Sequence, residues 1–556
     1  MLKGKMKQAF SRIYSRLLFY IKKIHILRTF FPPWPVISVL MPVYNTKPEI
    51  LRRSIESVLY QKYLRWELCI VDDGSTDTNI INILEYYAQK SSRIKMLFKK
   101  KNEGIAVTIN RAAGMAKGKF IGVLDHDDEL EPDTLLDYAE FIVRHPDADC
   151  IYCDEDKIDK DGKFCDAWYK SDWNSDLALS FNYVMHFAVY RRKLFKSIGG
   201  VRKLCEGSQD YDLLLRFSEI TDSIYHISKI LYHWRMGESS TALKPETKPE
   251  IFEKGLWALN DALKRRGIDG AAVHAPDAWL GVYRVNRSII NFLSCSVIVN
   301  YKGSDNGLFR LLESIGKHTK SFACEIIICP DSYYDMKSLN FIDTYDNVRI
   351  IQPEASMSVP KAYNLGAKNA VGRILFFVDD TMELVSKESY SCLIEHVQRD
   401  EVGAVGGKVY YDNNLIEHTG VIFGPFNIMG YAHRATPDNP GYVGLKNMIG
   451  NYSAVMGLGM MTRKSVFDDA GGFDEKFKTA YWDADYCLKL RDKKYLITYT
   501  PYAKLIHNIP VKSLEEMVIE PDASLFREKW QSVIDNDPFF NKNFNRQRED
   551  FTLEEN

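Results

Sequence analysis

The chain reads Phe120-Ile-Gly-Val-Leu-Asp125-His-Asp127-Asp128-Glu-Leu130 in the stretch that decides its fold. The apolar run 120–124 predicts a buried strand, and carboxylates follow it directly. In an open α/β sheet, ligands bind beyond the carboxyl ends of the strands. Asp125 and Asp127 are one residue apart, so their oxygens can share a hard divalent cation that also holds a phosphate. The alternative is an acidic turn without chemistry.

Length and composition indicate a globular protein with more than one domain. The 556 residues exceed what one hydrophobic core usually organises, and the apolar content of 46% is ordinary for a folded chain. The net charge of −1 predicts no nucleic-acid partner. The ten cysteines include one Cys-x-x-Cys pair, Cys150 and Cys153, without the second pair of a zinc site. We expect reduced thiols that pack in the core, as in cytosolic proteins.

Residues 1–35 are predicted to form a basic amphipathic helix and a linker. The first 48 residues contain no Asp or Glu. Apolar residues recur at helical spacing, with basic residues and serines between them, at Met6, Phe10, Ile13, Leu17, Ile21 and Ile24. This pattern favours an anionic membrane surface over a helix packed on the protein or a frayed tail. With no run of about 18 apolar residues and no secretory signal pattern, we expect a cytoplasmic protein, peripheral on the inner face of the cell membrane.

Strands and helices alternate in the predicted structure from residue 36 onward. The first strand covers 37–43, and Thr46 is expected to cap the next helix, with Glu49 completing a capping box. A second strand at 68–71 ends in Asp72-Asp73-Gly-Ser-Thr-Asp77, and a helix is predicted at 103–116. This order indicates right-handed crossovers and a mainly parallel sheet.

The second half of the chain repeats the first. Residues 325–331 match 67–73, residues 364–372 match 110–118, and residues 376–384 match 122–130. The predicted fold class is therefore α/β, with two tandem Rossmann-like domains. We place them at 36–285 and 290–515, followed by a C-terminal helical tail at 516–556.

The motifs of the chain resemble those of family 2 glycosyltransferases of the GT-A fold. In the first half the resemblance is carried by Pro42-Val-Tyr44, Val71-Asp-Asp-Gly-Ser75, Asp125 to Asp127, Cys153-Asp-Glu-Asp-Lys-Ile-Asp159, Gly207-Ser-Gln-Asp210 and Leu231-Tyr-His233-Trp-Arg235. In the second half it is carried by Gly471-Gly-Phe-Asp-Glu475 and Asp483-Ala-Asp485. The chain is most similar to bacterial enzymes that build O-antigen, capsule and related surface polysaccharides.

The resemblance implies a metal-dependent, inverting glycosyltransferase. It would use Mn²⁺ or Mg²⁺ and a UDP- or dTDP-linked nucleotide sugar as donor. The acceptor would be a glycan or a lipid-linked glycan.

By resemblance, Asp127 holds the metal, and Asp125 contacts the ribose or the metal. Pro42 and Tyr44 belong to the cofactor-binding residues. Asp73 would accept a hydrogen bond from the base, with Asp72 as the other choice, and the alternative for this stretch is an Asx-rich turn.

Three further residues of the first half are candidates for the chemistry. His233 is expected to complete the metal or diphosphate site, the alternative being a structural histidine. Arg235 balances the diphosphate charge or pairs with a surface acid. Asp210 is the candidate base that takes the proton of the attacking hydroxyl, and the compatible alternative is that it caps a helix at 211–217.

The second half keeps part of this set. Asp331, Asp483 and His507 match Asp73, Asp210 and His233, with Asp483 as its candidate base and His507 as its candidate metal ligand. Asp379 matches Asp125, but Thr381 stands where the first half has Asp127. A hydroxyl is a poor ligand for a hard cation, and Asp380 would have to replace the missing carboxylate.

Two readings of the whole chain remain open at this stage. In one, the chain is an enzyme with one or two active modules. In the other, it has a single site and its second half is a non-catalytic glycan-binding module. A nucleotidyltransferase would need a basic glycine-rich loop after the first strand, and none is present.

Overall fold

The computed structural model describes residues 34–237, 249–290, 294–319, 324–334, 341–353, 355–513 and 518–553. The predicted amphipathic helix therefore lies outside the described residues. The chain divides into two compact units, Met1–Lys170 with Tyr183–Ala262 and Ser171–Asn182 with Leu263–Asn556.

Among its described residues, the first unit contains nine strands and several helices. The strands are β1 (Ile37–Val43), β2 (Trp66–Asp72), β3 (Ile94–Phe98), β4 (Phe120–Val123), β5 (Glu129–Leu130), β6 (Cys150–Ile158), β7 (Phe164–Trp168), β8 (Val189–Arg191) and β9 (Ile224–Arg235). The helices are α3 (Pro48–Leu59), α4 (Thr78–Lys90), α5 (Ile105–Met115), α6 (Thr134–Arg144), α8 (Arg192–Ser197), α9 (Gln209–Phe217) and α10 (Pro249–Arg265), with the 3-10 helix η1 (Lys203–Cys205).

The strands of the first unit form one sheet in the order β3-β2-β1-β4-β8-β6-β9-β5, with β7 beside β6. β1 runs parallel to β2 and β4, and β2 runs parallel to β3. Beyond β4 the sheet is mixed, because β8 is antiparallel to β4 and β6. The predicted α/β class is confirmed. The carboxyl ends of β1, β2 and β4 meet at one edge, which is where ligands bind in such sheets.

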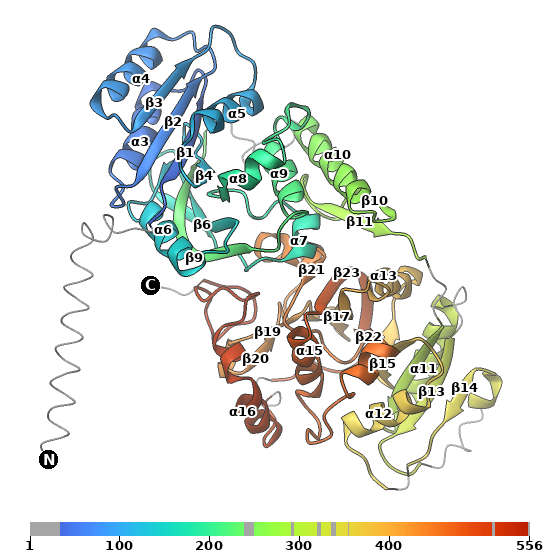
Figure 1. Ribbon diagram of the computed structural model, residues 1–556. Coiled ribbons are helices and arrows are strands. Elements are labelled where there is room, and N and C mark those ends of the chain that lie inside the picture. Colours follow the sequence, from blue (N-terminus) through green and yellow to red (C-terminus); the bar gives the residue numbers. More distant parts are fainter. Residues whose placement is uncertain are drawn as a thin grey trace, which may run out of the picture. The chain divides into compact units, whose positions relative to one another are not determined.

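Helices cover both faces of the parallel part of this sheet (Figure 1). α3 and α4 contribute Leu51, Ile55 and Ile80 to a buried core that contains Val39 and Leu68 of the strands. α5 packs against β1 and β2, and it lies on the opposite face of the sheet (Figure 1). Because both faces are covered, these strands are apolar throughout rather than alternating.

The start of α3 differs from its prediction. Pro48 is the first residue of this helix, and Lys47 is the N-cap, without a side-chain hydrogen bond. The capping box of Thr46 and Glu49 is therefore wrong. Proline suits the first helical position because the N–H it lacks has no partner there, and this fixes the cap at Lys47.

The second unit has a larger set of elements. Its strands are β10 (Gly270–His274), β11 (Tyr283–Arg287), β12 (Cys295–Tyr301), β13 (Cys324–Pro330), β14 (Val348–Ile350), β15 (Ile374–Asp379), β16 (Met382–Leu384), β17 (Val402–Tyr411), β18 (Ile416–His418), β19 (Val421–Phe423), β20 (Met429–Tyr431), β21 (Gly450–Asn451), β22 (Met460–Arg463) and β23 (Leu496–His507). Its helices are α7 (Ser175–Ser180), α11 (Asp305–His318), α12 (Val359–Asn369), α13 (Lys387–Val397), α14 (Lys464–Asp469), α15 (Trp482–Asp492) and α16 (Asp522–Asp535), with the 3-10 helices η4 (Ile342–Thr344), η5 (Pro425–Asn427) and η6 (Tyr442–Asn447).

The main sheet of the second unit has the order β14-β13-β12-β15-β22-β17-β23-β16. This is the strand order of the first sheet, with β12, β13 and β15 in the places of β1, β2 and β4. The registers agree as well, since Ile37 lies beside Phe120 in the first sheet and Cys295 lies beside Ile374 in the second. Asp379 therefore matches Asp125, because Asp125 comes five residues after Phe120 and Asp379 comes five residues after Ile374.

Both sheets contain the same buried clip between three strands. In the first, Ser38 donates a hydrogen bond to Glu67 at 2.6 Å, and the Gly118 N–H donates to the Ser38 hydroxyl at 2.9 Å. In the second, Ser296 donates to Glu325, and the Gly372 N–H donates to Ser296 at 2.8 Å. The clip connects β1 to β2 and to the start of β4. In the second unit it connects β12 to β13 and to the start of β15.

Residues 171–182 belong to the second unit although they lie within the first half of the sequence. Asp176 forms a buried ion pair with Arg399 at 2.9 Å and accepts a hydrogen bond from Asn451 at 2.8 Å. The β10–β11 hairpin and α16 also belong to this unit. The division thus differs from the predicted boundaries 36–285, 290–515 and 516–556, because long-range contacts of this kind leave no mark in the local sequence.

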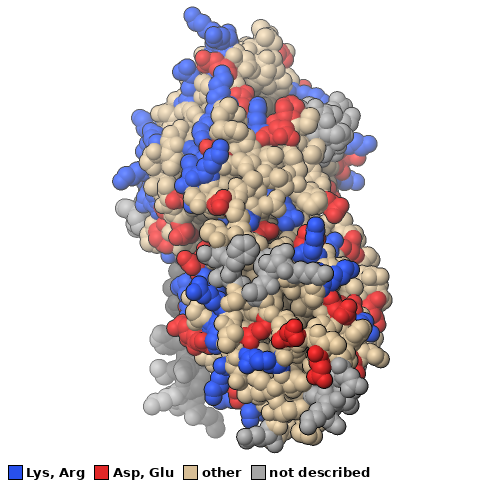
Figure 2. Space-filling view, turned by 90° about the vertical axis from the view of Figure 1, so that its right-hand side faces the viewer, with Lys and Arg blue, Asp and Glu red and all other residues tan. Residues whose placement is uncertain are grey.

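Charges of both signs lie among one another on the face shown in Figure 2. Among the described helices, none combines the length and the apolar character needed to cross a membrane. All ten cysteines fall in the described ranges, where each is a free thiol. Burial raises the pKa of Cys150 and Cys153, which keeps both protonated.

Candidate functional site

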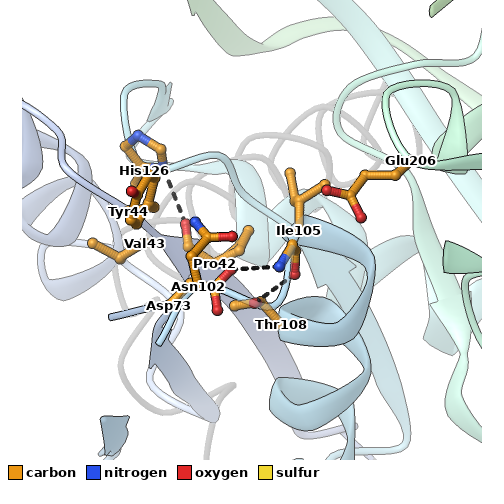
Figure 3. Close-up of a pocket in the computed structure, with 10 residues that line it drawn as sticks. Pro42, Val43, Tyr44, Asp73, Asn102, Ile105, Thr108, His126 and Glu206 are labelled. Atoms are coloured by element: carbon orange, nitrogen blue, oxygen red, sulfur yellow. Dashed lines mark hydrogen bonds between the residues drawn. The ribbon is translucent and has the colours of Figure 1, made fainter. Parts of the chain in front are cut away.

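A cavity of about 230 Å³ lies at the carboxyl end of β1 in the first unit. Pro42 and Tyr44, the predicted cofactor-binding residues of this strand, line it together with Asp73 and His126. Figure 3 shows Tyr44 and His126 on one side, Asp73 and Thr108 at the base and Glu206 across from them. The Nδ1 atom of His126 lies 3.0 Å from the Pro42 carbonyl oxygen, which holds the imidazole at the rim.

Asp73 is fixed at the base of this cavity. Its carboxylate accepts hydrogen bonds from the Glu103 and Gly104 N–H groups, each at 2.9 Å, at the start of α5. It also forms an ion pair with Lys99, which is itself buried. Three donors hold the side chain in one orientation, with its remaining lone pairs available to the cavity.

Asp72 has a different environment. It is 1% exposed, and its Oδ2 accepts from the Gly74 and Ser75 N–H groups at 3.1 and 3.0 Å. It closes an Asx turn after β2 and is absent from the residues that line the cavity. Of the two adjacent acids, the one at the cavity is Asp73.

Asp125, His186 and Asp210 line a second cavity, of about 70 Å³. Asp125 follows β4, Asp210 lies in the first turn of α9, and His186 comes from the segment before β8. Ser208, not Asp210, is the N-cap of α9, so the capping alternative for Asp210 is wrong. The helix begins earlier than predicted, at Gln209, which places Asp210 inside it.

Asp125 is more accessible than Asp128, with 37% of its side chain exposed, whereas Asp128 is 1% exposed. Burial of the carboxyl raises its pKa, and the negative charges of Asp127 and Asp210 act in the same direction against the attraction of His186. Its Oδ2 lies 3.9 Å from the Nε2 atom of His186. This carboxylate would be stabilised by added positive charge.

Asp128 is buried and acts within the protein. It accepts hydrogen bonds from the Tyr232 hydroxyl and, at 2.8 Å, from the Arg235 N–H. Burial raises its pKa well above the usual range, and the nearby Asp127 and Asp125 raise it further. Within the described residues, ligand atoms of Asp125, Asp128 and His186 lie within 4.8 Å of one another, a spacing compatible with a metal ion.

His186 was missed by the sequence motifs. Its Nδ1 atom lies 3.6 Å from Glu155, and its ring stacks on Tyr232 with 4.7 Å between centroids. Burial lowers its pKa, but Glu155, Asp128 and Asp125 outweigh this and raise it to about 9. The only sequence signal was a polar ring within an apolar run, which is usually a structural histidine.

A buried lysine completes the wall behind His186. Lys170 donates to Glu155 at 2.9 Å and to the carbonyl oxygens of Val184 and His186 at the same distance. Burial alone would raise the pKa of Glu155, but Lys170 and His186 lower it to about 2. Asp154, Glu155 and Asp156 are thus buried in β6.

His233 and Arg235 lie on β9, but neither joins this group. The Nδ1 of His233 lies 2.5 Å from Asp156, and its Nε2 lies 3.1 Å from Glu131. Burial lowers the pKa of His233, and these two carboxylates raise it above its usual value. Arg235 pairs with Glu129 and donates to the carbonyl oxygen of Asp127 at 3.0 Å. It therefore holds in place residues 125–128, which we call the acidic loop of the first unit.

The predicted residues of the second unit have protein partners. Asp331 accepts from the hydroxyls of Ser332 and Tyr334 at 3.0 and 3.3 Å. Asp483 accepts from the Gly457 and Ala484 N–H groups at 2.7 and 2.9 Å, and burial raises its pKa.

His507 does not take the position of His233. Leu130 pairs with Tyr232 in the first sheet, and Leu384 pairs with Leu505 in the second. Counting along the strand, His507 falls at the place of Trp234, and a shift of one residue turns a strand side chain to the other face. The Nδ1 atom of His507 lies 2.9 Å from Glu417.

Comparison with known proteins gives one family match and several relatives. Residues 38–199 match the family described as "Glycosyl transferase family 2". The protein y4gI of Sinorhizobium fredii is 34% identical over 536 residues, which cover 93% of this chain and 58% of that protein. The O-antigen biosynthesis protein RfbC of Myxococcus xanthus is 30% identical over 513 residues, which cover 91% of this chain and 40% of that protein.

A third relative matches a shorter part. The chondroitin synthase of Escherichia coli is 31% identical over 252 residues, which cover 45% of this chain and 36% of that protein. The chain therefore spans about half the length of the relatives it matches most fully. Residues 38–199 form a glycosyltransferase domain of family 2.

Proposed function

We propose that the chain is an inverting glycosyltransferase that transfers a sugar from a nucleotide-sugar donor to a glycan during the synthesis of a bacterial surface polysaccharide. The family of residues 38–199 and the name of the Myxococcus xanthus relative support this class of reaction. The observation that carries the proposal is that Asp125, His186 and Asp210 line one cavity, while Asp73 lines another whose wall includes His126, the residue after Asp125.

The larger cavity would hold the nucleoside of the donor. The Tyr44 ring is 43% exposed, which leaves a face for stacking on a base. Asp73 is held rigidly by three donors, and its remaining lone pairs would accept a hydrogen bond from the base. A UDP- or dTDP-linked sugar fits this arrangement, because both bases offer an N–H to a carboxylate.

Asp125, Asp127 and His186 would hold a divalent cation, Mn²⁺ or Mg²⁺, at the second cavity. Asp125 and His186 fit, because Asp125 is accessible and His186 offers a nitrogen 3.9 Å from its carboxylate. The part given to Asp127 rests on the resemblance of residues 125–127 to the family motif. The cation supplies positive charge that stabilises the diphosphate leaving group. Glu155 is placed to fix the orientation of the imidazole from behind, as carboxylates do for metal-bound histidines.

Asp210 would act as the base. It enters the same cavity from the first turn of α9, opposite the acidic loop, so it can take the proton of an acceptor hydroxyl as that hydroxyl attacks the sugar. A single displacement with one base inverts the anomeric configuration. Arg235 would position residues 125–128, and His233 would stay paired with Asp156 and Glu131, so neither would bind the metal or diphosphate.

For the whole chain, we propose two tandem domains, a lipid-linked glycan acceptor and attachment to the membrane surface. Two tandem GT-A domains are supported by the identical strand orders of the two sheets. A lipid-linked glycan acceptor and attachment to the inner membrane surface through residues 1–35 are supported by the basic composition of that segment. A second candidate function, a single-site enzyme with a glycan-binding second unit, is favoured by the partners of Asp379.

Matched variants of the two candidate bases test the proposal. A screen of UDP- and dTDP-sugars with Mn²⁺ first identifies the donor by nucleotide release. Asp210→Asn should then lower the rate by at least about 100-fold, because a positioned base contributes that much, while donor affinity and melting temperature stay unchanged. A full rate in Asp210→Asn would contradict the assignment.

Asp483→Asn is the control in the second unit. If it leaves nucleotide release and product unchanged, the single-site version holds. If a glycan product lacking one linkage accumulates, both units transfer sugar.

A further inference from the structure

The acidic loop of the second unit has the same position in the sheet as that of the first, but it has a different set of partners. The shared register places Asp379 at the position of Asp125 and Thr381 at that of Asp127. The same register places Lys302, the residue after β12, at the position of Tyr44, the residue after β1. Relative to the first unit, the second unit therefore has a hydroxyl in place of a carboxylate and an ammonium in place of a tyrosine ring. Both changes disfavour the binding of a cation.

The carboxylate of Asp379 is occupied by donors of the protein. Its Oδ2 accepts from the Lys302 ammonium at 2.8 Å. Its Oδ1 accepts from the Thr381 hydroxyl at 2.5 Å and from the Thr381 N–H at 3.0 Å. Asp379 is 1% exposed, so a cation could reach it only by displacing Lys302.

The side chain of Asp380 binds the backbone between β12 and α11. Its Oδ2 accepts from the N–H groups of Lys302 and Ser304 at 2.9 and 2.8 Å, which closes the loop before α11. Its Oδ1 is buried without a hydrogen-bond partner among the described residues. Because this oxygen is buried, a hard cation, which takes six or more ligands and keeps several waters among them, could not reach it from solvent with its shell intact.

Charge balance points in the same direction. In the first unit Asp125, Asp210 and His186 line one cavity. The negative charges of Asp127 and Asp210 act on Asp125 against the imidazole of His186, so added positive charge would be favourable. In the second unit the ammonium of Lys302 already balances Asp379, and a divalent ion beside it would meet like-charge repulsion. The side chain of Lys302 is 42% exposed, so its charge is accessible from solvent.

We propose that the second unit has no divalent-cation site, and that the ammonium of Lys302 is a fixed cation in the place where the first unit binds a metal. A phosphate-bearing ligand of the second unit would then meet an ammonium rather than Mn²⁺ or Mg²⁺. The claim about the second unit is independent of the first, whereas the expected total of one ion per chain rests on the proposed function.

Titration of the full-length chain with Mn²⁺, followed by the electron paramagnetic resonance signal of the free ion, counts the sites directly. The wild type should bind one ion. Asp125→Asn/Asp127→Asn should bind none, and the matched Asp379→Asn/Asp380→Asn should bind one with an unchanged dissociation constant. The gain variant Lys302→Met/Thr381→Asp should bind two.

The outcomes separate the two claims. Two ions in the wild type, with one lost in Asp379→Asn/Asp380→Asn, would overturn the inference about the second unit. One ion in a gain variant that keeps the wild-type melting temperature would contradict the role of Lys302 and Thr381. A count unaffected by Asp125→Asn/Asp127→Asn would instead overturn the metal site of the proposed function.

Discussion

Asp125 and Asp128 are three residues apart, yet their surroundings assign them opposite tasks. Asp125 is accessible and faces His186, whereas Asp128 is buried and held by Tyr232 and Arg235. The sequence predicted that acids would gather after β4, and Asp125 and Asp210 do share a cavity. The sequence could not show which of these acids is accessible to a metal and which is buried as a structural residue. That difference depends on the strand β9, which supplies Tyr232 and Arg235 as partners of Asp128.

The two histidines of the region are predicted to differ in their effect on metal binding. His186→Gln should weaken Mn²⁺ affinity by at least about tenfold, because a nitrogen beside Asp125 is lost. His233→Gln, the matched control, should leave the affinity nearly unchanged, since both ring nitrogens of His233 already face carboxylates. Calorimetric titration of both variants measures this, and a larger loss in His233→Gln would reverse the assignment.

At the scale of elements, the repeat detected in the sequence has a structural explanation. Glu67 and Gly118 recur as Glu325 and Gly372 because they form the same clip with Ser38 and Ser296. The fold was predictable for this reason, since the recurring residues are those that tie the strands together. The site of the second unit was less predictable, because Thr381 and Lys302 differ from the residues at the matching positions of the first unit, Asp127 and Tyr44.

The clip is predicted to make stability depend on pH. Burial alone would raise the pKa of Glu67, but hydrogen bonds from Lys95, Ser38, Lys117 and Gly118 lower it to about 2. A carboxyl with a depressed folded pKa stabilises the fold above its unfolded pKa of about 4.3, and this contribution is lost as the pH falls toward 2. Its size is on the order of 3 kcal/mol.

Glu67→Gln should therefore lower the unfolding free energy at pH 7 and flatten its decline between pH 5 and pH 2. Urea unfolding followed by fluorescence at several pH values measures both effects. Glu325→Gln is the matched variant in the second unit, where the pKa of Glu325 is also lowered. An unchanged pH profile in Glu67→Gln would show that the clip carries no charge-dependent stability.

At the scale of the whole molecule, residues 171–182 were the least predictable part. Nothing in their sequence indicates that Asp176 pairs with Arg399, more than two hundred residues away. Burial would raise the pKa of Asp176, but Arg399 keeps it well below its usual range. The boundary between the units therefore depends on pairings that only the folded chain reveals.

Asp176→Asn should destabilise the second unit, although the residue lies in the first half of the sequence. The change removes one of the two carboxylates that pair with the buried Arg399, the other being Glu401 at 2.9 Å. Loss of one partner of a buried pair costs up to about 3–5 kcal/mol. Hydrogen exchange should become faster in β21 and β23 and stay unchanged in β1 and β2. Faster exchange confined to β1 and β2 would contradict the assignment of this segment.

The central claim is that the acidic loop of the first unit binds the metal that a glycosyl transfer needs. The most direct test is nucleotide release from the identified donor by the full-length chain, with and without Mn²⁺, in the wild type and in Asp127→Ala. The account predicts Mn²⁺-dependent release by the wild type and a loss of at least about 100-fold in the variant. Full metal-dependent release by Asp127→Ala would contradict it.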